Sequence, residues 1–190
     1  LYWANFSKLG ASVVIGEEIT YLHSGLFCDD NLLESITINC DLEFLGVGTF
    51  YNTPELNSVA LNGSIEYIFG FTDVFNDDFY TWLTPLEKEQ IMYYGAFESC
   101  VNLSEVLFVE GEELLTIGDK AFYRCTALKS IKLPERTLSL GENCFDGSGL
   151  SDIDFGGVRT IAANAFGNTK SLSVLTIPAS VTEIGKYACL

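Results

Sequence analysis

The sequence has little positive charge and few residues suited to chemistry. Its 190 residues contain 10 Lys and Arg against 26 Asp and Glu, and its single histidine is His23. The formal net charge of −16 repels phosphates, so nucleic acid is excluded as a partner, and it disfavours anionic membrane surfaces. We expect the acidity to keep an aromatic-rich chain soluble; the alternative is that it marks a site for cations or basic partners.

Other absences narrow the function further. The six cysteines form no C-x-x-C pair and show no zinc-ligand spacing. No apolar run approaches 18 residues, which argues against membrane insertion by this segment. A phosphate-cradling glycine loop is also missing. We therefore expect no metal and no cofactor. There is no initiator Met and no secretory signal, and the sequence pattern starts and stops inside a unit, so we expect a segment of a longer protein.

What is present is a cassette that returns about every 23 residues, some seven times. Counted from a phenylalanine, an aliphatic residue stands at minus five, Leu at plus six, and further apolar residues at plus nine and plus eleven. A fixed period in this range indicates a solenoid, whose units bury their apolar faces against neighbouring copies. The phenylalanines are Phe27, Phe50, Phe97, Phe122, Phe145 and Phe166, the series after Phe145 running one residue early.

The cassette predicts local structure as well. The spacing L-x-x-I-x-L is a strand signature with inward side chains two apart, and a second short extended piece follows it. Pro134 and Pro178 come after two of these strands, where a residue without an N–H ends ladder pairing. The Ala-Phe pair is expected to open a short helical turn. The fold class is thus α/β: one right-handed solenoid over residues 1–190, with all six rings stacked in a buried column.

The string I-G-x-x-A-F-x-x-C-x-x-L-x-x-I-x-L-P, read at 117–134 and followed elsewhere by V-T-x-I-G at 181–185, resembles the BspA-type leucine-rich repeat. The resemblance covers residues 11–190 and is strongest over 94–190. It implies an α/β solenoid in a cell-surface or secreted protein of host-associated bacteria or some protists. It also implies adhesion or protein binding, and no catalysis.

One stretch departs from the pattern. Between Phe50 and Phe97 lie 47 residues, room for one more unit, yet Asp73 falls at the phenylalanine position. Thr84-Pro85-Leu86-Glu87 has the order of a helix start. Residues 69–93 are therefore interpreted as a degenerate repeat with a modified loop, with a dedicated binding feature as the alternative.

Candidates for chemistry are weak. His23 lacks a nearby nucleophile and carboxylate and is expected to be a surface turn residue. The pairs Asp29-Asp30 and Asp77-Asp78 resemble the acid/base pair of a glycoside hydrolase only in composition. The oxygen-rich stretch 73–78 lacks the spacing of an EF-hand calcium loop. Cys100 and Cys125 occupy one repeat position and are predicted to be unbonded neighbours, while Cys144 and Cys189 are predicted to fill the core.

The surface is the remaining candidate. If the strands alternate, one outward column contains Thr37, Ala60, Leu107, Lys132, Asp154 and Thr176, and a flanking column contains Ser35, Ser58, Glu105, Ser130, Asp152 and Val174. These mostly short, uncharged side chains suit either a docking face or tight strand stacking. The predicted ligand-binding residues are Tyr80, Tyr93, Tyr94, Leu107 and Lys132, for a protein or glycan ligand. The hypothesis is a non-catalytic interaction module at the cell surface or outside the cell; the alternative is a structural spacer, and a carboxylate-based glycoside hydrolase is less favoured.

Overall fold

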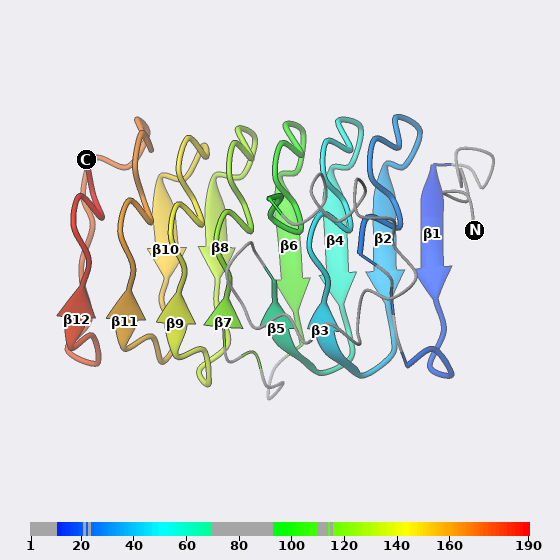
Figure 1. Cartoon of the computed structure of the whole chain (residues 1–190), viewed down its shortest axis with the longest axis horizontal. Coiled ribbons are helices and arrows are strands. Elements are labelled where there is room, and N and C mark those ends of the chain that lie inside the picture. Colours follow the sequence, from blue (N-terminus) through cyan, green and yellow to red (C-terminus); the bar gives the residue numbers. More distant parts are fainter. Residues whose placement is uncertain (1–10, 21, 23, 70–92, 110–113, 115) are drawn as a thin grey trace.

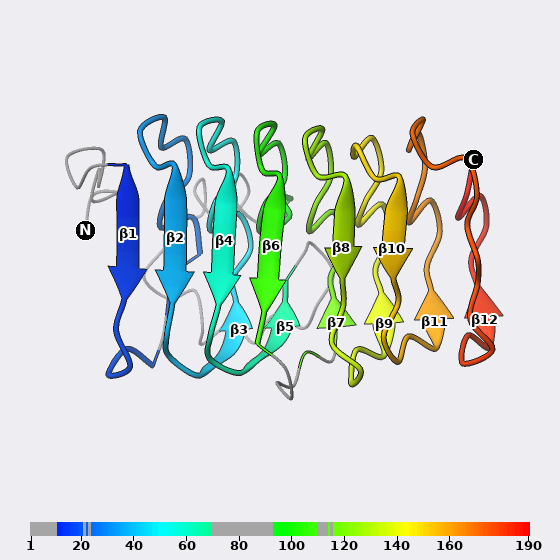
Figure 2. The ribbon, with the colours of Figure 1, turned by 180° about the vertical axis from the view of Figure 1, so that it is seen from behind.

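The computed structural model describes residues 11–20, 22, 24–69, 93–109, 114 and 116–190, and these form a right-handed β-solenoid. Each coil runs down one sheet, turns, runs up a second sheet and returns through a loop. The labelled N and C ends lie at opposite ends of the long axis (Figures 1 and 2). The coils are therefore stacked in chain order, as the fixed repeat predicts.

The first sheet carries the predicted L-x-x-I-x-L strands, all parallel and in the predicted register. Ile36 pairs with Val59 and Val59 with Val106, so equivalent repeat positions are neighbours. The strands are β1 (Ser12–Ile15), β2 (Ser35–Ile38), β4 (Ser58–Leu61) and β6 (Glu105–Phe108), continued on the same side by the pair β8 (Ser130–Lys132) and β10 (Asp152–Asp154).

The second sheet is also parallel and contains the second extended piece of each unit. Its order, β12-β11-β9-β7-β5-β3, again follows the chain. Leu45, Ile68 and Ile117 occupy the same inward position in successive strands and are fully buried. The strands are β3 (Leu42–Leu45), β5 (Ile65–Ile68), β7 (Thr116–Ile117), β9 (Ser139–Leu140), β11 (Thr160–Ile161) and β12 (Glu183–Ile184).

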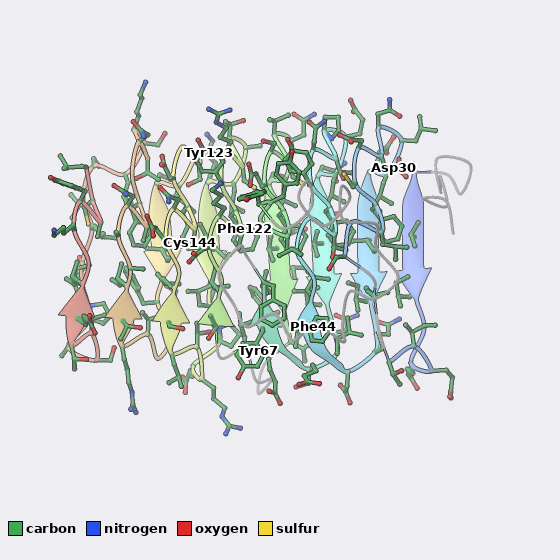
Figure 3. The ribbon with its side chains drawn as sticks, in the orientation of Figure 1. Asp30, Phe44, Tyr67, Phe122, Tyr123 and Cys144 are labelled. Carbon is green, nitrogen blue, oxygen red and sulfur yellow. The ribbon has the colours of Figure 1, made fainter. Side chains whose placement is uncertain are left out.

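The predicted phenylalanine column lies in the interior under the loops, and the prediction is confirmed. Successive rings stack with centroids 5.1 to 5.7 Å apart and planes within 7° of parallel, from Phe27 to Phe166. All six rings are at most 3% exposed. Figure 3 shows Phe122 inside the stack, below the exposed loop that bears Tyr123. The coil spacing of a parallel sheet, about 4.8 Å, sets the ring spacing.

The prediction of short helical turns is wrong. The described residues contain no helix, and the loops are consecutive tight turns with hydrogen bonds such as Tyr51 N to Gly48 O and Thr53 N to Phe50 O. Two residues per loop, two before and two after the phenylalanine, have positive φ, as Gly48 and Asn52 do around Phe50. A left-handed residue on either side of the ring prevents a run of right-handed helical conformation.

The loops are hydrogen-bonded to each other as well as within themselves. Phe50 N donates to Ala96 O at 2.8 Å, Phe97 N to Ala121 O at 2.8 Å, and Phe122 N to Cys144 O at 2.8 Å. Alternate loop N–H groups thus point along the solenoid axis to the next coil. This ladder satisfies backbone groups that a buried loop would otherwise leave without partners.

Residues 70–92 lie outside the described part of the chain, but their flanks are informative. Phe50 stacks directly on Phe97, β4 pairs with β6, and β5 pairs with β7. Phe69 follows β5 as Gly46 follows β3, and Tyr94 stands three residues before its phenylalanine as Val47 does. The predicted degenerate repeat near 69–93 therefore adds no coil between these neighbours, which a single coil spacing already separates.

The coil after Phe166 differs from the prediction. Residues 172–177 were predicted as a strand, but they form no ladder pairs in the structure, and Leu175 and Ile177 are only partly buried. Cys189, predicted to fill the core, is exposed, and its pKa is raised by partial burial. A ring or strand in the repeat is covered by the coil that follows it, and no described residue covers these.

Candidate interaction surfaces

The outer face of the first sheet presents the two predicted columns. Val14, Thr37, Ala60 and Leu107 are aligned by strand pairing, as are Ser12, Ser35, Ser58 and Glu105. Lys132 pairs with Asp154 and Ser130 with Asp152 on the second pair of strands. Ser35 Oγ donates to Ser12 Oγ at 2.9 Å. The alternation of inward and outward side chains is confirmed over these strands, and it creates an open, nearly flat face.

Two apolar side chains stand out on this face. Val14 is 65% exposed and Leu107 is 52% exposed, while the small Thr37 and Ala60 between them are half-buried. Charge begins beyond Leu107, at Lys132 and Asp154, both exposed. The first-sheet face, defined here as Val14, Thr37, Ala60, Leu107 and Lys132, therefore changes from neutral to charged along the axis.

A second candidate lies on the loops, where Tyr51 and Tyr94 stack with centroids 3.7 Å apart. Burial and the neighbouring Tyr94 raise the pKa of Tyr51 to about 12. Glu98 is nearly buried; its Oε2 accepts a hydrogen bond from Gly95 N at 3.1 Å. Burial raises the pKa of Glu98, and the Gly95 hydrogen bond and the nearby Lys120 and Arg124 only partly oppose that shift. The Arg124 guanidinium lies 5.0 Å from the centre of the Tyr123 ring.

The structure does not bring the predicted binding residues onto one surface. Leu107 and Lys132 lie on the first-sheet face, whereas Tyr94 packs at the loop edge on Tyr51. Tyr93 is 52% exposed, and its carbonyl accepts a hydrogen bond from Lys120 Nζ at 3.3 Å. Tyr80 and His23 lie outside the described residues. The sequence placed the tyrosines next to the strand residues because it assumed that residues 69–93 follow the coil.

The cysteines serve packing. Cys100 Sγ donates to Phe50 O at 2.9 Å and Cys125 Sγ to Phe97 O at 3.1 Å, and both are free thiols, in line with the prediction that they are unbonded. Burial raises the pKa of Cys100 to about 12, and it raises that of Cys125 well above the ordinary range. Cys144 is fully buried with its Sγ toward Ala165 O, as predicted for a core residue. Thiols held protonated in this way are poor nucleophiles.

The carboxylates considered for acid/base chemistry have structural partners. Asp29 Oδ1 accepts a hydrogen bond from Asn52 Nδ2 at 2.6 Å, one coil away. Asp30 Oδ1 accepts hydrogen bonds from Leu32 N and Leu33 N, which closes the turn before β2. The pair Asp77-Asp78 falls outside the described residues. Within the described ranges, no three His, Cys, Asp or Glu side chains gather into a metal-binding group, and no helix has the length and apolarity to cross a membrane.

The outer face of the second sheet holds a group of rings that sequence reasoning missed. Phe44 pairs with Tyr67, and Phe69 lies 5.2 Å from Phe44 and 5.7 Å from Tyr67, centroid to centroid. Glu43 and Glu66 stand next to the two paired rings, and Figure 3 shows Phe44 and Tyr67 side by side over β3 and β5. We call Glu43, Phe44, Glu66, Tyr67 and Phe69 the acidic aromatic face. The missed signal is an aromatic residue at a position that other coils fill with Thr116 or Ser139.

Stacked parallel strands, one leucine-rich cassette per coil and a single phenylalanine column define a leucine-rich repeat solenoid. Six copies of the model for the BspA type leucine rich repeat region match the sequence, over residues 5–78 and 90–190. The chain belongs to the BspA-type leucine-rich repeat family, which confirms the resemblance seen in the sequence. No curated protein matches it.

Solved structures agree on the fold. A leucine-rich repeat protein of T. pallidum is 19% identical, with a TM-score of 0.65 over 93% of this chain and 69% of its own. A leucine-rich repeat protein of Eubacterium ventriosum gives 20% and 0.68, covering 95% of this chain and 42% of its own. A leucine rich cell surface protein of Faecalibacterium prausnitzii gives 21% and 0.61, covering 94% and 44%. This chain thus spans less than half the length of the last two.

Proposed function

We propose that this solenoid is a non-catalytic interaction module of a cell-surface or secreted protein, and that it binds a protein or glycan through its first-sheet face. The observation that carries the proposal is the exposure of Val14 and Leu107 on a flat, hydrogen-bonded sheet whose remaining outward side chains are short. A rigid face of this kind loses little conformational entropy when a partner covers it. Membership of the BspA-type family supports an interaction role, and the F. prausnitzii protein of similar fold is named a cell surface protein.

The contact residues proposed on this face are Leu107 and Lys132. Leu107 supplies apolar area at the point where the face turns from neutral to charged, and Lys132 supplies the charge. Tyr93 and Tyr94, together with Tyr80, are retained as a second contact region beside the loops. Exposed aromatic side chains give large contact area at low entropic cost, which suits protein and sugar ligands alike.

Screening the isolated segment against glycan arrays and extracellular proteins, followed by titration of each hit, tests the proposal. Leu107→Asp should weaken a genuine ligand about tenfold or more, because the substitution places a charge in the desolvated contact. Leu138→Asp is the matched control, since Leu138 is 40% exposed and lies away from this face. Equal affinity of the Leu107 variant and wild type for every hit would remove the first-sheet face from the binding site. Absence of any ligand would instead favour the structural spacer.

A further inference from the structure

The acidic aromatic face is a local feature and not a requirement of the repeat. The position of Phe44 and Tyr67 is occupied by Thr116, Ser139 and Thr160 in later strands of the same sheet. The residue after each strand is Gly46, Gly118 or Gly141 in other coils, but Phe69 in this one. Coils without these rings keep the same strand pairing, so the repeat is complete without them.

The carboxylates of this face lie close enough to disfavour each other. Leu42 pairs with Ile65 and Phe44 with Tyr67, which leaves Glu43 and Glu66 side by side on adjacent strands. Like charges in such cross-strand positions are destabilising. Glu43 is exposed and Glu66 half-buried, and the rings beside them are half-buried. A cation bound between the carboxylates and over the rings would remove the repulsion.

The charge of the surrounding chain has the same sign. Residues 1–119 contain two basic residues, Lys8 and Lys88, and 20 acidic ones, a formal charge of −18, while residues 120–190 contain eight basic and six acidic residues, a charge of +2. No Lys or Arg occurs between positions 8 and 88, which spans every coil of the acidic aromatic face. The acidity of the protein is therefore concentrated on one part of its length.

From these observations we propose that the acidic aromatic face binds a lysine- or arginine-rich segment of a partner protein. Cationic side chains pair with Glu43 and Glu66 and stack over the rings of Tyr67 and Phe69, where cation–π contact adds to the ionic attraction. The field of the −18 half steers the positively charged segment to this side of the solenoid. The alternative that the acidity marks a site for basic partners is thus the one that the structure supports.

The inference deepens the proposed interaction role by naming the chemistry of a partner, and it concerns a different face. A ligand that depends on Leu107 can exist whether or not this site does. Conversely, a cationic segment can bind here even if the first-sheet face binds nothing. The two proposals therefore fail separately.

The test is a titration of the 190-residue segment with a fluorescent nona-arginine peptide at about 50 mM salt. The double variant Glu43→Gln/Glu66→Gln should weaken binding about tenfold, since exposed ion pairs contribute up to about 1 kcal/mol each. Tyr67→Ser, which changes no charge, should weaken it about threefold through the lost cation–π contact. Affinity should fall as salt is raised, because screening shortens the reach of the charges.

The matched control is Glu135→Gln/Glu142→Gln, which removes the same charge from exposed positions in later coils. It should change affinity less than twofold. No binding of the peptide by wild type, or equal weakening in both double variants, would overturn the proposal, because the attraction would then be absent or diffuse. Loss of binding in Tyr67→Ser with full binding in Glu43→Gln/Glu66→Gln would also overturn it and point to a neutral ligand such as a sugar.

Discussion

The solenoid contains two groups of aromatic rings, one inside and one outside, and they differ in regularity. The six buried phenylalanines stack within 7° of parallel, whereas Phe69 is tilted by 31° to Phe44 and by 19° to Tyr67 on the outer face. The inner rings recur in each coil from Phe27 to Phe166, while the outer rings occur only in the two coils before residue 70. A side chain that the coil geometry requires recurs with the period, and one that it does not require is free to serve a local purpose.

Removing one ring from each group is the largest test of this comparison. Phe122→Ala should lower the free energy of unfolding by about 3–5 kcal/mol, because it leaves a cavity in the middle of the stack. Tyr67→Ala should cost less than about 1 kcal/mol, as expected for a half-buried surface ring. Chemical denaturation of both variants measures the difference. A loss below about 1 kcal/mol for Phe122→Ala would mean that the column does not carry the stability of the fold.

A smaller effect is expected at the turns that hold the inner rings. Asn52 has a φ of 51°, and its Nδ2 donates to Asp29 Oδ1 at 2.6 Å. Asn52→Ala should cost about 1–2 kcal/mol, because a left-handed conformation is strained for alanine. Asn52→Gly keeps that conformation accessible and should cost less. Equal losses in the two variants, measured by thermal unfolding, would show that the side-chain hydrogen bond matters and the backbone conformation does not.

The smallest effect concerns an acidic group at the outer edge. Burial raises the pKa of Glu98, so the folded protein binds the proton more tightly than the unfolded chain does. Stability therefore falls as pH rises from the unfolded pKa through the raised folded value, and it is level above that. Glu98→Gln lacks this fall while its amide oxygen can still accept the Gly95 N–H. The variant should be the more stable protein at neutral pH, and the two should converge in acid.

Melting temperatures at a series of pH values measure this convergence. Glu142→Gln, at an exposed position, is the control. Parallel pH curves for wild type and Glu98→Gln would mean that the carboxylate of Glu98 is as well accommodated in the folded protein as in water.

The core could be predicted from sequence because burial recurs with the period. Phe122, Leu128 and Ile131 are each at most 4% exposed, and the same spacing gives the register of the strands. The loop conformation was predicted wrongly, although Gly25, Gly48 and Asn143 already pointed to left-handed turns. Lys120 and Arg124 occupy the same two positions with positive φ, and such residues do not announce that conformation.

The binding surfaces could be predicted only in part. Period-two alternation was enough to place Leu107 on an outer face. The acidic aromatic face depends on the pairing of Phe44 with Tyr67 and on the contacts of Phe69, which bring together residues 25 apart. Sequence reasoning treated residues 65–68 only as an extended piece of the repeat. Which outward aromatics meet is decided by strand register, and register becomes certain only in three dimensions.

The loop ladder has a mechanical consequence. Its hydrogen bonds, such as Phe97 N to Ala121 O, run along the solenoid axis, and the chain ends described here lie at opposite ends of that axis. A pull on both ends therefore loads the coils in series and opens these bonds one coil at a time, like a zipper, instead of shearing many together. Each coil of 23 residues, the spacing of the Ser12–Ser35 pair, would release about 80 Å of chain. A tether built this way yields in steps and keeps its remaining coils folded while it lengthens.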